Sequence, residues 1–391
     1  MNDIQLGVIT LIKSAITGDK LTLPDGFSMD EALPVLKKHG IQAMGYIGAV
    51  NCGIPKSEPV MQALFQFYCR SAVSSQRQLD KINQLFAAFE DNGIDYMPLK
   101  GTIMKHLYPS HELRPMGDAD VLIRVEQYDR IKPIMDSLGY TSGEENAHEL
   151  PWRCPELYVE LHKCLIPESN KELHAYYGDG WSRATNENGC RYQMTAEDQF
   201  VFLFTHFVKH FGGGGIGCRH VTDLWVFQKK HPAMDQAYIQ QQMKKLHLLE
   251  FYSNMHAMIS CWLDQGQWNE KTEFIAEFIF NSGIWGKQKS HDLAANAKFA
   301  DKSGNVGKGK WSHFLSRVFP GLTNIGYQYP VVKKVPIFLP VFWVVRWVHI
   351  AIHKPDVMKR RFQMLDSSNN DEILTWQKNM DYVGLGRTLD S

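Results

Sequence analysis

Two aspartates, Asp118 and Asp120, stand two positions apart at the start of a run of β-forming residues in GDADVLI, residues 117–123. Because side chains alternate faces along a strand, residues i and i+2 project from the same side, and we expect the two carboxylates to point together. Like charges this close repel unless a cation lies between them, and carboxylate oxygens are the ligands that Mg²⁺ binds. The stretch therefore predicts a metal site. The alternative is a polar turn in which one aspartate binds its own backbone.

A third carboxylate follows in LYVELHK, residues 157–163, where alternation puts Glu160 and His162 on the face opposite the apolar residues. A charge in a half-buried strand is costly unless it is paired or bound to a metal, so this strand is expected to lie beside ADVLIRV and bring Glu160 to the aspartates. Three carboxylates can hold one or two Mg²⁺ or Mn²⁺ ions, an arrangement suited to phosphoryl or nucleotidyl transfer. His162 is expected to orient Glu160 or to contact substrate.

The segment YMPLKGTIMKHLYP, residues 96–109, has the pattern of a phosphate-binding turn. A strand ending before Lys100, a glycine at Gly101 and a helix that follows at once allow backbone N–H groups to approach an anion. Lys100 and Arg114 would add positive charge for a triphosphate. The alternative is that both basic side chains are solvated surface charges.

Two histidines, His206 and His210, are four apart and share a helix face, which is the spacing of a zinc pair. The glutamate of the HExxH metalloprotease motif is absent, and no third ligand follows at a diagnostic interval. We expect these histidines, with Lys209, Arg219 and Asp223, to line a cleft between an α/β unit and a helical region. The alternative is a buried polar cluster whose hydrogen bonds are satisfied internally.

The elements that must position these residues follow from hydrophobic periodicity. Residues 1–91 are predicted to be helical, with one long amphipathic helix from Pro59 to Asn92. Residues 92–190 are predicted to form an α/β unit, and residues 191–391 a helical region whose first two helices meet at the glycines 212–215. The expected fold class is α+β, a small mixed sheet flanked by helices on both sides in the sequence. Within the α/β unit we expect strands at 94–100, 119–125 and 157–163, helices at 101–108 and 126–140, and loops at 141–154 and 186–190.

Two later segments are distinctive. Residues 294–310 are polar and rich in Gly and Lys, which favours a mobile loop. Residues 335–352 are apolar and about long enough to span a bilayer, with basic residues on both sides, namely Lys333, Lys334, Lys354, Lys359, Arg360 and Arg361. Arg346 and His349 within the run, and two prolines near its start, favour a buried or interfacial helix over a membrane span. Peripheral membrane contact through 335–352 follows as an expectation.

The composition sets limits on partners and location. Lys and Arg together number 42, as do Asp and Glu, so the chain has no global charge that would favour nucleic acid, and no template is expected. The seven cysteines form no CxxC pair, which predicts reduced thiols in a cytoplasmic protein. The amino terminus lacks the basic segment and small-residue cleavage site of a secretory signal.

With these motifs the chain resembles the nucleotidyltransferases of the DNA polymerase β-like superfamily. Their pattern is a hydrophobic strand, a glycine with a small hydroxyl residue, a helix, Asp-x-Asp on the next strand and a third acid on a later one, matched here by Leu99, Gly101, Thr102, Asp118, Asp120 and Glu160. The segments LKG, LYP, RPMGDADVLI, LGY and VELH are similar to the branch called uncharacterised nucleotidyltransferases, often encoded in bacterial polysaccharide or peptide-natural-product clusters. The interval from Gly101 to Asp118 is longer than is usual for the superfamily.

The resemblance implies roles for the matched residues. Asp118 and Asp120 would bind the nucleotide-bearing metal, Glu160 a second metal, and Gly101 and Thr102 the β- and γ-phosphates. The implied reaction is Mg²⁺- or Mn²⁺-dependent transfer of a nucleoside monophosphate from an NTP to a hydroxyl of a small-molecule or protein acceptor. The alternative is an inactive nucleotide-binding or scaffolding module of a biosynthetic gene cluster.

Overall fold

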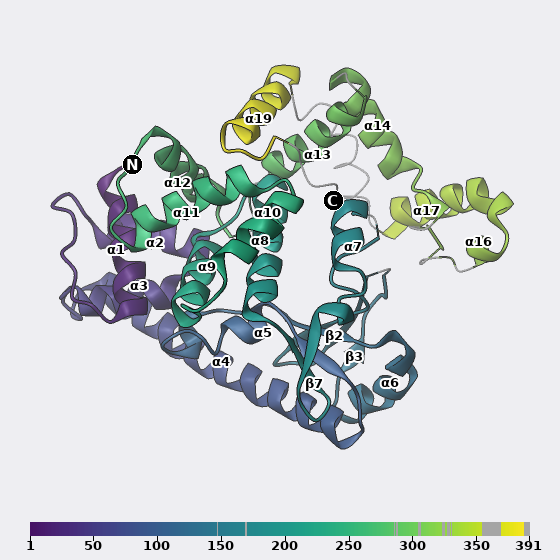
Figure 1. Cartoon of the computed structure of the whole chain (residues 1–391), viewed down its shortest axis with the longest axis horizontal. Helices are drawn as coiled ribbons and strands as arrows, with labels where there is room; N and C mark the ends of the chain where they lie inside the picture. The colour runs from purple at the N-terminus through teal and green to yellow at the C-terminus, as the bar shows by residue number, and fades with distance from the viewer. Residues whose placement is uncertain are drawn as a thin grey trace.

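The protein is described by a computed structural model, which covers residues 1–146, 148–168, 170–284, 286, 288–303, 306–322, 325–326, 329, 331–353 and 369–386. A mixed sheet lies at one end of the molecule, a long helix runs beneath it, and helices from both ends of the chain pack above and beside it (Figure 1). The predicted α+β class, with a small mixed sheet between helical regions, is confirmed.

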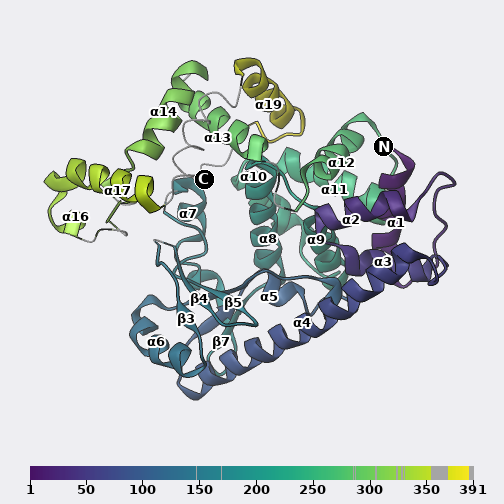
Figure 2. The same cartoon turned by 180° about the vertical axis from the view of Figure 1, so that it is seen from behind.

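The N-terminal helices are α1 (Asp3–Thr17), α2 (Met29–His39), α3 (Gln42–Asn51) and α4 (Pro59–Asp91). The long helix ends one residue before its predicted limit. Its first half buries Val60, Met61 and Leu64 among α1 to α3, whereas its last turns bury Leu85 and Phe89 under the sheet. Helix α4 therefore joins the N-terminal helices to the sheet (Figures 1 and 2).

The sheet has seven strands in the order β3-β4-β5-β2-β1-β7-β6. Their bounds are β1 (Tyr96–Pro98), β2 (Ala119–Ile123), β3 (Thr141–Ser142), β4 (Glu149–Arg153), β5 (Tyr158–His162), β6 (Ala184–Asn188) and β7 (Arg191–Met194). Strand β2 pairs with β1 antiparallel and with β5 parallel. Helix α5 (Gly101–Met104) follows β1 and is shorter than predicted, and α6 (Tyr128–Ser137) covers the lower face.

Two predicted loops are correct only in part, because each also contains strand residues. Within 141–154 the structure has β3 and β4, and β4 buries Leu150 and Trp152 while pairing with β5. The residues 186–190 belong to the β6–β7 hairpin at the edge of the sheet. The edge strands β3 and β6 have exposed, polar side chains, so they lack the hydrophobic alternation on which the prediction depended. Strand β4 lies inside the sheet, but Pro151 interrupts its short apolar pattern.

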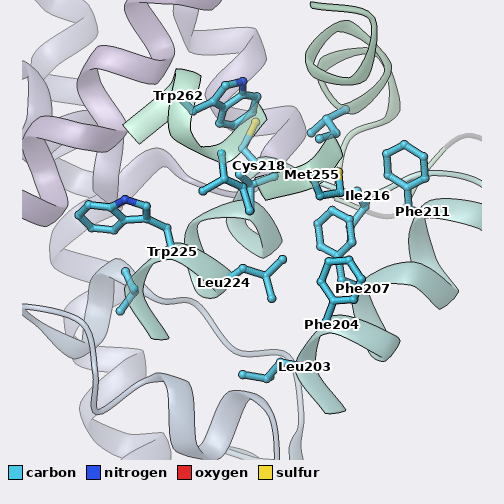
Figure 3. Close-up of a cluster of buried hydrophobic side chains, with 14 of the residues drawn as sticks. Leu203, Phe204, Phe207, Phe211, Ile216, Cys218, Leu224, Trp225, Met255 and Trp262 are labelled. Carbon is cyan, nitrogen blue, oxygen red and sulfur yellow. The ribbon is translucent and has the colours of Figure 1, made fainter. Parts of the chain in front are cut away.

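The helical region begins with α7 (Lys171–Tyr177), α8 (Ala196–Gly212), α9 (Cys218–Lys230), α10 (Gln236–Lys245), α11 (Leu249–Leu263) and α12 (Glu270–Ser282). Helix α8 is preceded by the N-cap residue Thr195, whose side chain accepts a hydrogen bond from the backbone N–H of Asp198. Figure 3 shows Phe204, Phe207 and Phe211 along one side of α8, in the core that α8 shares with α9 and α11. The glycine corner that follows adopts φ values of +136° at Gly214 and +121° at Gly215, which only glycine takes readily.

The predicted loop at 294–310 is wrong. Helix α13 (Gln288–Ser303) covers its first part and α14 (Val306–Val318) its last, and Ala294 and Ala297 are buried. Alanine and lysine have high helix propensities, which here outweigh the polar composition.

Beyond α14 the structure describes α16 (Val331–Lys334), α17 (Leu339–His353) and α19 (Asn370–Tyr382). Among the described residues, Pro336–His353 is long and apolar enough by length and composition to cross a membrane, with a mean hydropathy of 1.4, yet only 6% of it is buried. The prediction of a buried helix is therefore wrong, and the interfacial alternative stays a prediction. The basic residues Lys354, Lys359, Arg360 and Arg361 lie outside the described residues.

The hydrophobic core forms two clusters. One fills the space among α1 to α4, the upper side of the sheet and α8 to α12, whereas the other lies between the lower side of the sheet, α4 and α6. The N-terminal helices thus share a core with the later helical region. The division at 1–91, 92–190 and 191–391 stays a prediction.

One buried side chain, His39, ties α2 to the later helices. Its Nδ1 accepts the backbone N–H of Cys218 at 3.2 Å, so its Nε2 carries the proton and donates to the Phe280 carbonyl at 3.2 Å. Burial lowers the pKa of His39 to about 4, below its ordinary value of 6.5. His39 therefore becomes protonated near pH 6.5 in the unfolded chain but only near pH 4 in the folded chain.

We expect acid to destabilise the fold through His39. Stability that is present above pH 6.5 is lost as the pH falls, by about 2 kcal/mol from this residue between pH 7.5 and pH 5. Urea unfolding across this range should show the loss, and His39→Gln should flatten the pH dependence by a similar amount. An unchanged pH dependence in the variant would contradict the assignment.

Candidate functional site

The site is built on the parallel pairing of β2 with β5. The register sets Asp120 directly beside Glu160 and Leu122 beside His162, so the predicted neighbouring of these two strands is confirmed. One ligand atom from each of Asp120, Glu160 and His162 lies within 4.8 Å of the others. The pairing of adjacent strands, and not loop flexibility, therefore fixes the distance between the acids.

Asp120 is the most buried of the three predicted acids, 5% exposed. Its Oδ1 accepts hydrogen bonds from Lys100 Nζ at 2.8 Å and His162 Nε2 at 2.7 Å. Burial alone would raise the pKa of this carboxyl, but Lys100 and His162 outweigh burial and hold the pKa below its usual range. Asp120 is therefore ionised and held in one orientation by two partners, and His162 contacts Asp120 more closely than it does Glu160.

Asp118 lies just before β2 and is half-buried. It lines the same pocket as Asp120 but stands outside the group that Asp120 forms with Glu160 and His162. Burial and the charge of Asp120 raise the pKa of Asp118, against the effect of nearby basic residues. The carboxylate is thus less stable in its charged form than a solvated aspartate would be.

Glu160 has a neighbour that the sequence analysis missed. Burial, followed by a hydrogen bond with Glu149 of β4, raises the pKa of Glu160 to about 8. Glu149 pairs in register with His162, and His148, Glu149 and His162 form a second group of side chains with ligand atoms within 4.8 Å of one another. Residues 141–154 are predicted to form a loop, so His148 and Glu149 are absent from the predicted site residues. The alternation of Leu150 and Trp152 was the one available signal.

The residues of the predicted phosphate-binding turn do not all reach the pocket. Lys100 has a positive φ of 45° at the start of α5, and its side chain reaches the acids, while Gly101 lines the pocket. Thr102 instead is buried, with its hydroxyl 3.4 Å from the Asp120 carbonyl, and does not line the pocket.

A pocket separates the sheet from α8 and α9. From the sheet side it is lined by Lys100, Gly101, Arg114, Gly117, Asp118 and Asp120, and from the helices by Leu203, His206, Phe207, Arg219, His220, Asp223 and Leu224. The expectation of a cleft at this boundary therefore agrees with the structure for His206, Arg219 and Asp223. His162, Lys209 and His210 do not line it, although Lys209 lies within electrostatic reach of Lys100 and the acids.

The two predicted zinc-pair histidines bind each other. The Nε2 atoms of His206 and His210 are 3.1 Å apart, and burial lowers the pKa of His210 to about 4. Two neutral rings at this distance share one N–H···N hydrogen bond. Neither of the metal-ligand groups in the described part of the chain includes them, so the buried polar pair accounts for this motif.

Arg114 is buried, so the alternative of a solvated surface charge is wrong for this residue. It donates to Asp223 of α9 through Nη2 at 2.8 Å and Nε at 3.3 Å, and Tyr108 donates to the same carboxylate at 2.7 Å. Beside this pair, Arg219 donates one bond to the Pro115 carbonyl, and its buried Nε has no hydrogen-bond partner among the described residues. Arg219 therefore keeps one unpaired N–H donor beside the pocket that it lines.

Gly101 is required by the close approach of Arg114. A Cβ at this position would lie 2.7 Å from Arg114 Nη1 and 3.1 Å from Met116 Cγ. We expect Gly101→Ala to lower the free energy of unfolding by about 1–3 kcal/mol, since the guanidinium that must move is held by Asp223. Gly117→Ala is the matched control, because a Cβ there meets no atom within 4 Å. Urea titration of both variants checks this, and equal losses would contradict it.

The comparison with known families agrees with this geometry. A family model described as uncharacterised nucleotidyltransferase matches residues 25–264, which include every residue that lines the pocket. No curated protein and no solved structure matches the chain. The match covers more than half of the sequence and bears out the resemblance seen in its motifs. The chain therefore belongs to the family of uncharacterised nucleotidyltransferases.

Proposed function

We propose that this nucleotidyltransferase moves a nucleoside monophosphate from an NTP to a hydroxyl of a small-molecule or protein acceptor, with Mg²⁺ or Mn²⁺ as cofactor. The observation that carries the proposal is the pairing of Asp120 with Glu160 on adjacent strands, beside a pocket that Asp120 lines together with Asp118, Lys100 and Arg219.

The donor set fits a divalent cation. Asp120 and Glu160 offer carboxylate oxygens within 4.8 Å of each other, and Asp118 lines the same pocket. Lys100 Nζ, 2.8 Å from Asp120, shows that a positive charge is stable at this position. Asp118, Asp120 and Glu160 would hold the metal. A bound Mg²⁺ or Mn²⁺ supplies positive charge to the phosphoryl oxygens and lowers the pKa of the attacking hydroxyl.

The chain's own residues supply positioning and charge. Lys100 and Arg219 reach the pocket and would neutralise the triphosphate with their positive charge. His162 donates to Asp120 and keeps that carboxylate oriented. The apolar residues Leu203, Phe207 and Leu224 form the wall opposite the acids, which limits water around the reacting phosphate.

The proposed reaction is a single displacement at phosphorus. The acceptor oxygen bonds to the α-phosphorus, the bond from that phosphorus to the β-phosphate oxygen breaks, and pyrophosphate leaves. We assign the hydroxyl proton to Glu160, the third carboxylate of the site. In-line displacement of this kind depends on positioning and charge neutralisation more than on covalent catalysis.

The test is pyrophosphate release from each of the four NTPs with Mg²⁺ or Mn²⁺ and a cell extract as the source of acceptor. Wild type is compared with Asp118→Ala/Asp120→Ala and with Asp129→Ala/Asp136→Ala, a control pair on the exposed side of α6. Release that only the first double variant abolishes supports the proposal. Metal-dependent nucleotide binding without release would replace it with the inactive module, and the absence of both would overturn the metal site itself.

A further inference from the structure

Helix α17 lies at the edge of the molecule, away from α1 to α3, in both views (Figures 1 and 2). One side of it faces the protein. Trp343 Nε1 donates to the Pro320 carbonyl at 3.0 Å and Trp347 Nε1 to the Val318 carbonyl at 2.9 Å, while the Phe342 ring contacts Tyr329. The aromatic side of α17 is thus fixed against the end of α14 and the segment after it.

The other side of α17 is aliphatic and exposed to solvent. Its residues recur at three- and four-residue spacing and are between 44% and 67% exposed, namely Val341, Val344, Val345, Val348 and Ile352. The exposed surface continues before the helix with Ile337, 80% exposed, and Phe338, 48% exposed. These seven side chains are called the outer face below. A helix of a water-soluble domain usually turns its apolar side inward, so a continuous outward stripe marks a surface that another apolar medium covers.

The charged residues that lie near α17 in the sequence have one sign. No Asp or Glu occurs between Asp301 and Asp356, whereas the same interval contains the basic residues Lys302, Lys308, Lys310, Arg317, Lys333, Lys334, Arg346 and Lys354. The chain as a whole is neutral, so this positive segment is local. Exposed aliphatic side chains combined with basic residues are the features of a helix that lies in the interface of an anionic bilayer.

We propose that the outer face of α17 binds the surface of a membrane containing anionic lipids, with the helix lying in the plane of the interface. Its valines and isoleucines enter the boundary between headgroups and acyl chains, and the neighbouring basic residues bind lipid phosphates. The nucleotidyltransferase pocket would then act next to a membrane surface. This attachment does not depend on the proposed reaction.

The geometry disfavours a membrane span. The 18 residues Pro336–His353 correspond to about 27 Å at 1.5 Å per residue, so length alone does not exclude a span. Spanning would, however, detach Trp343 and Trp347 from their carbonyl partners and take Arg346, which bonds the Arg317 carbonyl, into the bilayer. An interfacial position keeps all of these contacts.

The test is cosedimentation of the full chain with vesicles of phosphatidylcholine alone and of equimolar phosphatidylcholine and phosphatidylglycerol. Val344→Glu/Val348→Glu places two charges on the outer face. The matched control is Val73→Glu/Val125→Glu, which makes the same change at two valines that are 54% and 52% exposed elsewhere. Since all four side chains are solvent-exposed, both variants are expected to fold, and circular dichroism checks that they do.

We expect wild type and the control to sediment with the anionic vesicles, and the outer-face variant to bind at least about tenfold more weakly. Binding should be weaker to phosphatidylcholine alone and should weaken as salt is raised to about 1 M. Equal binding by the two variants, or no vesicle binding by wild type, would overturn the proposal.

Two other outcomes would assign the surface differently. If wild type forms a dimer without lipid and the outer-face variant does not, the surface binds a second copy of the chain. Membrane-bound protein that resists alkaline carbonate would show a span. Either of these results would also overturn the proposal.

Discussion

Asp118→Asn is expected to abolish nucleotidyl transfer while leaving the protein at least as stable as wild type. The carboxylate is half-buried, and both burial and the nearby charge of Asp120 raise its pKa, so the folded state disfavours its negative charge. Removing that charge relieves the repulsion. Transfer should nevertheless fall by at least about 10³-fold, because the amide lacks the charge that a divalent cation requires.

Asp120→Asn is the matched comparison. It should lose transfer to a similar degree but also destabilise the fold, because Asp120 is buried and partners both Lys100 and His162. The variant leaves the Lys100 ammonium without its counter-charge. We therefore expect the free energy of unfolding to fall by about 3 kcal/mol. Pyrophosphate release measures the loss of transfer in both variants, and urea unfolding measures their stability. If Asp118→Asn proved the less stable protein, the electrostatic description of the site would be wrong.

The ion pair between Arg114 and Asp223 is expected to give the largest loss of stability. Both side chains are 8% exposed, and Asp223 also accepts the Tyr108 hydroxyl. Asp223→Ala leaves a buried guanidinium without its counter-charge, which should lower the free energy of unfolding by about 3–5 kcal/mol.

Two further variants separate the charge from the packing. Asp223→Asn keeps an oxygen that can accept the Tyr108 hydroxyl, so it should lose less stability than the alanine variant. The double variant Arg114→Met/Asp223→Leu removes both charges and should recover most of the stability, since a buried ion pair is often replaceable by apolar residues of similar volume. Urea denaturation compares all three. A loss below about 1 kcal/mol for Asp223→Ala would show that the pair is not desolvated in solution.

The sequence was informative where alternation was strong. In residues 157–163 three apolar residues alternate with Tyr158, Glu160 and His162, so both the strand and the face that carries the acid were predictable. In β4 the apolar residues are only Leu150 and Trp152, and Pro151 between them argues against a strand. Pairing with β5 outweighed that local signal, and so Glu149 and His148 escaped the prediction of the site.

Burial of charge was the other feature that local patterns could not reveal. Arg114 and Asp223 each have the sequence environment of a surface residue, and their burial depends on meeting each other across the cleft. Two of the residues expected in the cleft, Arg219 and Asp223, do line the pocket, and both lie on the first turns of α9. Thr102 shows the converse, because its place in a motif did not determine where its hydroxyl points.

The contact between Arg114 and Asp223 also bears on how the chain is made. The two residues are 109 positions apart, so at a synthesis rate of about 5–20 residues per second Arg114 is made about 5–20 seconds before its partner. During that interval a guanidinium destined for the interior has no counter-charge to meet. Arg114 therefore gains its counter-charge only after α9 has been synthesised, and the pocket that Arg114 and Asp223 both line can be completed only at that stage.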